Sequence, residues 1–308
     1  MKLATFIDPA LSFAPRLGVL RDSGMVDITA AAHRLGRNVP AASAKAAIAA
    51  GRPALDALAE IAAAAEAAGH VTPVESLKFL PPIPDPSKFF CVGKNSHKHR
   101  EELLANQMLT EIPNEPTGFI KLVDTMRGQD AEVARPRGIT TLDYEPELVF
   151  VVGRRAHRVT KAEALDHIAG ITLFNDITMR EIQKREVASG SRFWTAKNAP
   201  GFAPTGPVIA TLDEVADLDD LWLTCDVNGE RRLRESTSEF IFRIADVLAH
   251  FTQHVVFEPG DLIAMGAPKG TAVGHDNAEE LYLRPGDRME IAIEGLMSLR
   301  TTIVADGD

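Results

Sequence analysis

Two acidic residues stand directly before a strongly apolar run in the middle of the chain. The stretch from Leu142 to Val152 ends in Leu-Val-Phe-Val-Val, a sequence typical of a β-strand. Side chains alternate between the faces of a strand, so Glu145 and Glu147 are expected to share one face, together with Asp143. Carboxylates on one face repel one another unless a cation lies between them. This stretch therefore constrains both the local fold and the chemistry that it can hold.

A second apolar run, beginning at Gly170, ends in Asp176, which could complete an acidic site. Hard oxygen ligands without His or Cys favour Mg²⁺, Mn²⁺ or Ca²⁺ over zinc. The alternative interpretation is the solvated face of an edge strand with an acidic turn nearby. Spacing alone leaves both interpretations open, because short motifs also occur by chance.

Composition and charge exclude several classes of protein. The chain has 308 residues, of which 45% are hydrophobic and 25% charged, as in an ordinary globular protein. The net charge of −10 argues against a general binder of nucleic acid or of an anionic membrane, because such a binder needs a basic face. No apolar run is as long as about 18 residues, so no transmembrane helix is expected.

The N-terminus and the cysteines predict a cytoplasmic location. An acid and a proline follow the start of the chain too early for a signal peptide. The two cysteines, Cys91 and Cys225, are far apart in the sequence, so a disulfide framework is not expected. Both features fit a reducing compartment.

A proline-rich stretch divides the chain. Residues 80–88 contain four prolines, which predicts an extended, stiff boundary between a small N-terminal domain, 1–80, and a catalytic domain, 81–308. Short strands are expected up to residue 31 and alanine-rich helices over 41–68. The remainder is rich in strand patterns, with helical patterns at 161–169, 179–188 and 237–253.

A polar segment that follows a predicted strand carries a second candidate site. His99 and Glu102 are three residues apart, so they are neighbours if the segment is helical. A carboxylate beside an imidazole orients the ring and raises its basicity, as a general base requires. The alternative is an exposed helix face rich in charges.

Several motifs, in order, resemble those of the fumarylacetoacetate hydrolase family, in particular its longer bacterial acylpyruvate hydrolase-like members. The resemblance covers about residues 80 to 304. It is carried by Cys91-Val-Gly-Lys-Asn95 with His99 and Glu102, Leu142-Asp-Tyr-Glu-Pro-Glu-Leu148, Asn175-Asp-Ile-Thr-Met-Arg180 with Gln183, Lys197 followed by Phe202-Ala-Pro-Thr-Gly-Pro207, Asn228-Gly229 and Pro259-Gly-Asp261. Residues 16–20 and 26–28 resemble the small N-terminal domain of the longer members.

The resemblance implies an α+β, β-rich fold: a mixed β-roll with peripheral helices, a small N-terminal α/β domain and assembly as a homodimer. It assigns a divalent metal, usually Mg²⁺ or Mn²⁺ with Ca²⁺ as a substitute in crystals, to Glu145, Glu147 and Asp176. It also assigns a catalytic role to a water-activating pair on a segment that closes over substrate, His99 and Glu102, and to Lys197, which would hold substrate or the developing oxyanion.

Four further residues are candidates for substrate binding: Asn95, Arg180, Gln183 and Lys269. Arg180 and Gln183 either bind a substrate carboxylate or orient Asp176 without binding the metal themselves. Lys269 either replaces a lost substrate contact or is simply exposed.

Among the departures from the family pattern are three single replacements, and the motif Glu294-Gly-Leu-Met-Ser-Leu299 also differs from its family form. Ser96 replaces a tyrosine, Pro200 replaces an acid, and Ala267 replaces a threonine. They fall where the family contacts substrate or shapes the pocket, so they leave the substrate open.

The expected function is metal-dependent hydrolysis of a C–C bond in a small 2,4-dioxo acid, such as an acylpyruvate or fumarylpyruvate. A bound Mg²⁺ can stabilise the enolate of a 2-oxo acid, and the His99–Glu102 pair favours a reaction with activated water. The same enolate serves a lyase, a decarboxylase, an isomerase or a dehydratase, which are the alternatives. A non-catalytic metal-binding paralogue is the third interpretation.

Overall fold

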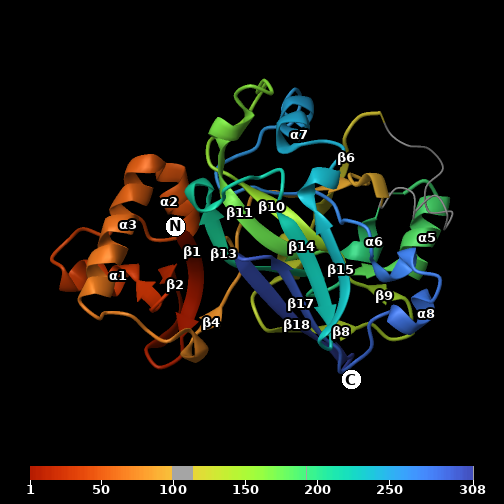
Figure 1. The fold of residues 1–308 in the computed structure, drawn as a ribbon, viewed down its shortest axis with the longest axis horizontal. Helices are drawn as coiled ribbons and strands as arrows, with labels where there is room; N and C mark the ends of the chain where they lie inside the picture. The colour runs from red at the N-terminus through yellow and green to blue at the C-terminus, as the bar shows by residue number, and fades with distance from the viewer. Residues whose placement is uncertain (99–113, 192, 308) are drawn as a thin grey trace.

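The computed structural model describes residues 1–98, 114–191 and 193–307 (Figure 1). Most strands belong to one mixed, 11-stranded sheet, whose main path has the order β3-β2-β1-β13-β11-β10-β16-β5-β6. Its strands are β1 (Lys2–Asp8), β2 (Ser12–Arg21), β3 (Gly24–Asp27), β4 (Lys78–Phe79), β5 (Phe89–Gly93), β6 (Thr117–Lys121), β7 (Met126–Arg127), β10 (Pro146–Val152), β11 (Ile168–Asn175), β13 (Ala203–Thr211) and β16 (Leu262–Ala264).

A second sheet of five strands has the order β15-β14-β17-β18-β8. Its strands are β8 (Ala131–Arg135), β14 (Trp222–Val227), β15 (Glu230–Ser236), β17 (Arg288–Ile293) and β18 (Met297–Ala305). A two-stranded pair joins β9 (Leu142–Asp143) to β12 (Thr178–Met179). The protein is therefore β-rich, as the sequence predicts.

Short helices surround the sheets. Figure 1 shows three of them beside the N-terminal strands: α1 (Ile28–Arg34), α2 (Ala44–Ala50) and α3 (Arg52–Ala67). The other described helices are α5 (Arg180–Ala188), α6 (Trp194–Lys197), α7 (Ile244–Phe251) and α8 (Ala278–Leu281). None of the described helices is long and apolar enough to cross a membrane.

The N-terminal strands extend the large sheet. β1 pairs antiparallel with β13, with Lys2 opposite Ala210 and Leu3 opposite Ile209. No helix or strand lies between β4 and β5, where the prolines occur. Main-chain hydrogen bonds thus join the N-terminal segment to the rest of the chain.

The central strand β10 is buried on both faces. Phe150 lies in a core cluster that includes Ile291 of β17, whereas Val151 lies in a second cluster that includes Leu58 of α3. The alternation of a strand sends neighbouring side chains into these two cores. A strand that is covered on both faces has a continuous apolar sequence, which explains the run of apolar residues in β10.

Two expected helices differ from the structure. The helical pattern at 161–169 was a wrong prediction, because only the 3₁₀ turn Ala164–His167 forms there. The apolar residues that follow form β11, which pairs with both β10 and β13. The pattern at 237–253 is α-helical only over Ile244–Phe251, with a separate 3₁₀ turn at Thr237–Glu239. The Asp246 carboxylate accepts a 2.9 Å hydrogen bond from the Arg243 backbone N–H and starts the helix there.

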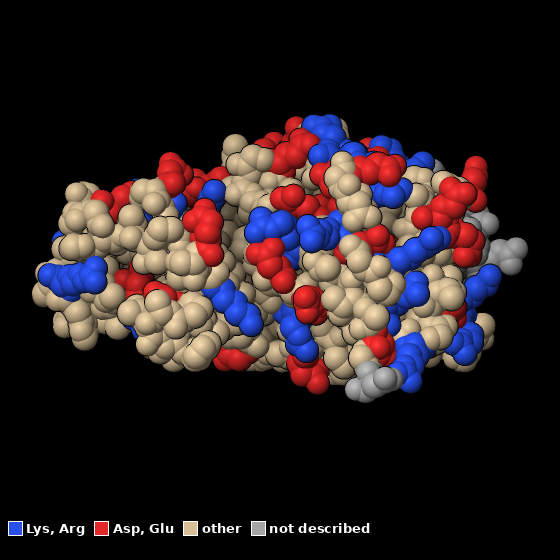
Figure 2. All heavy atoms as spheres, turned by 90° about the horizontal axis from the view of Figure 1, so that it is seen from below, with Lys and Arg blue, Asp and Glu red and all other residues tan. Residues whose placement is uncertain are grey.

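Acidic and basic side chains lie intermixed on the face shown in Figure 2. The exposed ion pairs of the protein include Arg300 with Asp130 at 2.7 Å and Arg234 with Glu294 at 2.8 Å. Exposed pairs of this kind contribute only about 0–1 kcal/mol each. The stability of the fold therefore depends mainly on its apolar core clusters.

Replacing Leu3 with Ala tests whether the N-terminal strands and the larger part unfold together. Leu3 is fully buried opposite Ile209, so Leu3→Ala is expected to lower the free energy of unfolding by ~2–5 kcal/mol. Trp194 and Trp222 lie outside the N-terminal segment, so their fluorescence reports on the larger part. Urea unfolding followed by Trp fluorescence and by circular dichroism should shift to the same lower midpoint.

Leu11→Ala is the matched control, because Leu11 is 65% exposed and its loss should change stability by less than about 0.5 kcal/mol. An unshifted Trp transition in Leu3→Ala would show that the N-terminal strands unfold on their own.

Candidate metal centre

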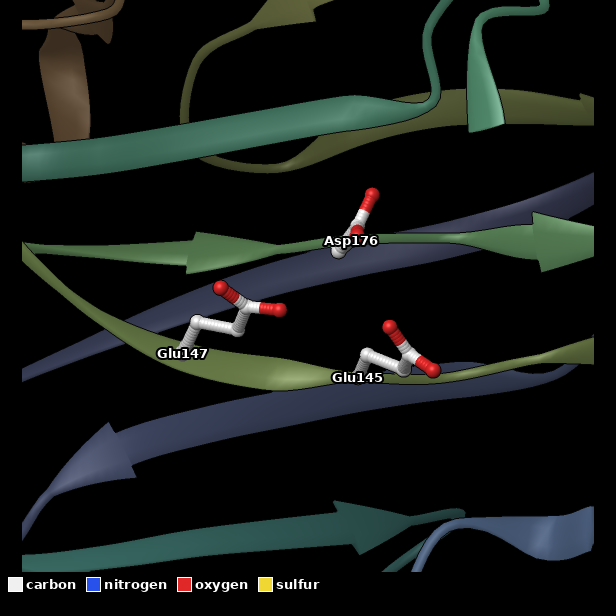
Figure 3. Close-up of side chains that lie close together, drawn as sticks. All are labelled: Glu145, Glu147 and Asp176. Carbon is white, nitrogen blue, oxygen red and sulfur yellow. The ribbon is translucent and has the colours of Figure 1, made fainter. Parts of the chain in front are cut away.

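Three buried carboxylates converge at the ends of two central strands. Glu145, Glu147 and Asp176 each offer an oxygen, and these atoms all lie within 4.8 Å of one another (Figure 3). All three residues are at most 4% exposed. Anions buried this closely need cations or hydrogen bonds, because loss of hydration is expensive for a charge.

Backbone hydrogen bonds fix the spacing of these acids. β10 starts at Pro146, directly after Glu145, and β11 ends at Asn175, directly before Asp176. The Asp176 N–H donates to the Glu145 carbonyl at 2.8 Å, and the Glu145 N–H donates to Asn175 Oδ1 at 2.9 Å. The two strand ends therefore hold Glu145 and Asp176 side by side.

Lys197, at the end of α6, lies among these acids. Its Nζ is 2.5 Å from Glu145 Oε2, 2.5 Å from Asp176 Oδ2 and 2.8 Å from Thr178 Oγ1. Burial alone would lower the pKa of the Lys197 ammonium, but the charges of Asp176 and Glu145 raise it above its ordinary value. Lys197 is therefore a cation inside the site.

Arg180, at the start of α5, supplies a second cation. Its Nη2 lies 2.6 Å from Glu145 Oε1, its Nε donates to Asp143 Oδ2 at 2.7 Å, and its Nη1 donates to Gln183 Oε1 at 2.9 Å. Burial acts to lower the pKa of the Arg180 guanidinium, but Glu145 and Asp143 raise it. Arg180 thus fixes the Glu145 oxygen that Lys197 does not contact.

Asp143 does not join the acidic cluster, so its expected place beside Glu145 and Glu147 was wrong. β9 ends at Asp143 and β10 begins only at Pro146, so the alternation of a single strand does not extend across this gap. Asp143 instead accepts from Arg180 and from the backbone N–H groups of Ala272 at 2.8 Å and Val273 at 3.0 Å.

The carboxylate of Glu147 is held by a hydrogen bond from a backbone N–H group. Glu147 Oε2 accepts a hydrogen bond of 2.9 Å from the Gly266 N–H. Burial, together with the charges of Asp176 and Glu145, raises the pKa of Glu147 well above its ordinary value. A further cation among the three acids would oppose this shift, because it would favour the ionised form.

Lys121 belongs to the site, although sequence reasoning missed it. This lysine is completely buried and lies 2.8 Å from Asp176 Oδ1. It ends the short strand β6, next to apolar residues, and nothing in that local pattern connects it with Asp176. Only the pairing of β6 with β5 and the folding back of α6 bring it there.

The remaining candidate residues are divided between the cavity and its surroundings. Gln183 and Ala267 line the cavity above the acids, together with two aromatic rings, Phe119 and Phe193, that meet edge-to-face at 5.4 Å. Lys269 is exposed and does not line this cavity.

Asn95 and Ser96, which follow β5, make contacts within the fold. The Asn95 amide donates to the carbonyls of Phe242 and Met265, at 3.0 Å each, and accepts from the Phe242 N–H. Ser96 is buried and its backbone pairs with Phe240.

The predicted water-activating pair, His99 and Glu102, lies outside the described residues.

The donor set fits a hard divalent cation. Carboxylate oxygens from three residues gather within 4.8 Å, and within the described ranges no sulfur or imidazole joins them. A lysine ammonium already lies between two of the acids, which shows that they can share a cation. Glu145, Glu147 and Asp176 are therefore a possible metal site, as the sequence predicted.

Removing one acid tests this site. Glu145→Gln is expected to lower the affinity for Mn²⁺ at least ~10-fold. Residues that only hydrogen-bond to metal ligands typically contribute that much, and a direct ligand should contribute more. Isothermal titration of metal-stripped protein measures the affinity, and thermal unfolding with EDTA checks that the variant folds. Glu132→Gln, on the exposed surface of β8, is the matched control. Wild-type affinity in Glu145→Gln would contradict the assignment.

Known proteins of similar sequence and structure identify the family. Residues 88–304 match the fumarylacetoacetate hydrolase C-terminal family. A mitochondrial oxaloacetate tautomerase of Homo sapiens is 34% identical over 226 residues, which are 73% of this chain and 69% of the relative. The oxaloacetate tautomerase YisK of Bacillus subtilis (strain 168) is 34% identical over 232 residues, 75% of this chain and 74% of the relative.

The crystallised fumarylacetoacetate hydrolase of Exiguobacterium antarcticum superimposes with a TM-score of 0.76 at 26% identity, over 99% of this chain and 100% of the other. The sequence match and the shared fold agree with the motifs found in the sequence. The chain therefore belongs to the fumarylacetoacetate hydrolase family.

Proposed function

We propose that this protein is a divalent-metal-dependent enzyme that interconverts the enol and keto forms of a small 2-oxo dicarboxylic acid of the oxaloacetate class. The observation that carries the proposal is the contact of Lys197 Nζ with Glu145 and Asp176, 2.5 Å from each, beside a cavity. This arrangement places a fixed positive charge next to the candidate metal ligands. The names of the two relatives support the choice of reaction.

Mg²⁺ or Mn²⁺, held by Glu145, Glu147 and Asp176, would draw electron density from the keto oxygen of a bound 2-oxo acid and so favour the enolate.

Lys197 is the residue we assign to the reacting oxygen. The charges of Asp176 and Glu145 raise the pKa of its ammonium, and this positive charge would stabilise the oxygen that gains negative charge in the enolate. Arg180 and Gln183, which also line the cavity, are the candidates for holding the substrate carboxylate. Phe119 and Phe193 provide an apolar part of the cavity lining.

The reaction needs only a proton shift. The enol loses the proton of its O–H group, its C3 gains a proton, and the electron pair of the C=C bond forms the new C–H bond. No water is added and nothing is oxidised or reduced. Lys197 stabilises the oxygen as the O–H proton leaves, and bulk solvent balances the two protons.

Hydrolysis of an acylpyruvate-type 2,4-dioxo acid is the second candidate. It is favoured by the presence of His99 and Glu102 three residues apart in the sequence, a combination suited to activating water if the segment is helical. Water would attack the carbonyl at C4, and the C–C bond would break to release a pyruvate enolate and a second acid. A decarboxylase or lyase would use the same enolate and differ only in the bond that breaks.

A substrate panel distinguishes these reactions. Oxaloacetate, acetylpyruvate, fumarylpyruvate and a 2,4-dioxo sugar acid are incubated with Mg²⁺ or Mn²⁺, and with EDTA as the control. Tautomerisation should remove the enol absorbance of oxaloacetate faster than the metal and buffer alone, without forming pyruvate or CO₂, and EDTA should abolish the acceleration. Pyruvate with a second acid would indicate a hydrolase, and CO₂ a decarboxylase. No turnover of any substrate would contradict both candidates.

His99→Ala separates the two candidate reactions within one protein. Loss of the base is expected to lower any hydrolysis by ~10²–10⁴-fold while Mn²⁺ affinity stays unchanged. Oxaloacetate tautomerisation, which adds no water, should retain most of its rate. His97→Ala is the matched control, because His97 is exposed. An equal loss of both activities would show that His99 also serves the proton shift.

A further inference from the structure

Lys121 is a buried cation for which the proposed reaction has no direct use. Its side chain is 0% exposed. Its Nζ donates to Asp176 Oδ1 at 2.8 Å, to the Phe202 carbonyl at 3.0 Å and to the Lys197 carbonyl. A lysine ammonium has three N–H donors, and here each finds one acceptor. The position and orientation of this group are therefore closely determined.

The contact with Asp176 orients a candidate metal ligand. One carboxylate oxygen, Oδ1, bonds to Lys121, while the other, Oδ2, faces Lys197 in the acidic cluster. A carboxylate held at one oxygen cannot rotate freely about its terminal bond. Lys121 thus determines which Asp176 oxygen points toward the metal site.

The carbonyl contacts fix the backbone that carries Lys197. Helix α6 ends at Lys197, so its carbonyl has no partner within the helix, and Lys121 provides one. The neighbouring Asn198 strengthens this attachment, because its Oδ1 accepts from the Leu122 N–H at 2.7 Å. The end of β6 therefore anchors the segment 197–202.

Lys121 does not line the cavity above the acids, whereas Lys197 and Asp176 do. We propose that Lys121 is a positioning residue that aims Asp176 at the divalent cation and holds Lys197 over the substrate. This inference rests on the proposed function for its activity readout, but not for its metal-binding readout.

A purely structural role is the alternative, and the chain contains a matched pair for comparison. Lys88 Nζ lies 3.1 Å from Asp261 Oδ2, and Asp261 is completely buried. Neither residue lines the cavity. Breaking this pair should cost stability without changing the metal site.

The experiment compares Lys121→Met with Lys88→Met in metal-stripped protein. Mn²⁺ affinity is measured by electron paramagnetic resonance of the free ion, and thermal unfolding by circular dichroism. Lys121→Met is expected to lower Mn²⁺ affinity by ~10–100-fold. Lys88→Met should lower the melting temperature but keep the affinity within about twofold. Wild-type affinity in Lys121→Met, or an equal loss in both variants, would overturn the proposal.

Two further variants cover failure to fold and separate the roles of the lysines. If Lys121→Met does not fold, Lys121→Gln replaces it in the comparison, because its amide keeps a hydrogen-bond donor on a side chain of similar length. Its Mn²⁺ affinity should lie between that of the wild type and the loss expected for Lys121→Met. Wild-type Mn²⁺ affinity in Lys121→Gln would then count against the proposal. In the activity assay, saturating Mn²⁺ should recover part of the kcat of Lys121→Met but none of that of Lys197→Met.

If the wild-type protein binds Mn²⁺ but turns over no substrate, the proposed function is contradicted. The role of Lys121 in metal binding is not, because the affinity comparison does not depend on turnover. Equal recovery of Lys121→Met and Lys197→Met at high Mn²⁺ would show that Lys121 has no separate positioning role.

Discussion

The balance of buried charge at the ends of β10 and β11 governs the rest of this structure. Three carboxylates are buried and lie within 4.8 Å of one another. Ionised groups in a protein interior are costly unless opposite charges and hydrogen bonds surround them. The described structure meets this requirement with Lys121, Lys197 and Arg180, each from a different element. The positions of β6, α6 and α5 are therefore tied to the acids.

The covering of the large sheet on both faces explains why the site is buried at all. β10 contributes to one core toward the second sheet and to another toward the N-terminal helices. The ends of the central strands consequently lie inside the protein, and carboxylates placed there keep a low-dielectric environment. In such an environment Lys197 exerts a stronger effect on a developing negative charge than it would in water.

The sequence predicted Glu145, Glu147 and Asp176 because strand alternation and ordered motifs report on neighbours close in the chain. The same reasoning failed for Asp143, since the interruption between β9 and β10 cannot be read from a two-residue period. It also missed Lys121, whose acceptor at the end of α6 lies 76 residues away. Roles that depend on distant segments meeting in space leave no local pattern, so buried lysines of this kind need the fold.

The departures from the family pattern lie at different places relative to the cavity. Of the three, only Ala267 lines the cavity, whereas Ser96 is buried away from it and Pro200 is exposed. A threonine hydroxyl in a cavity demands a partner, and a substrate without one would leave that hydroxyl unpaired. Alanine removes this demand. Among the described residues, the change at position 267 is therefore the one that can widen or shift the choice of substrate without disturbing the acids, Lys197 or Arg180.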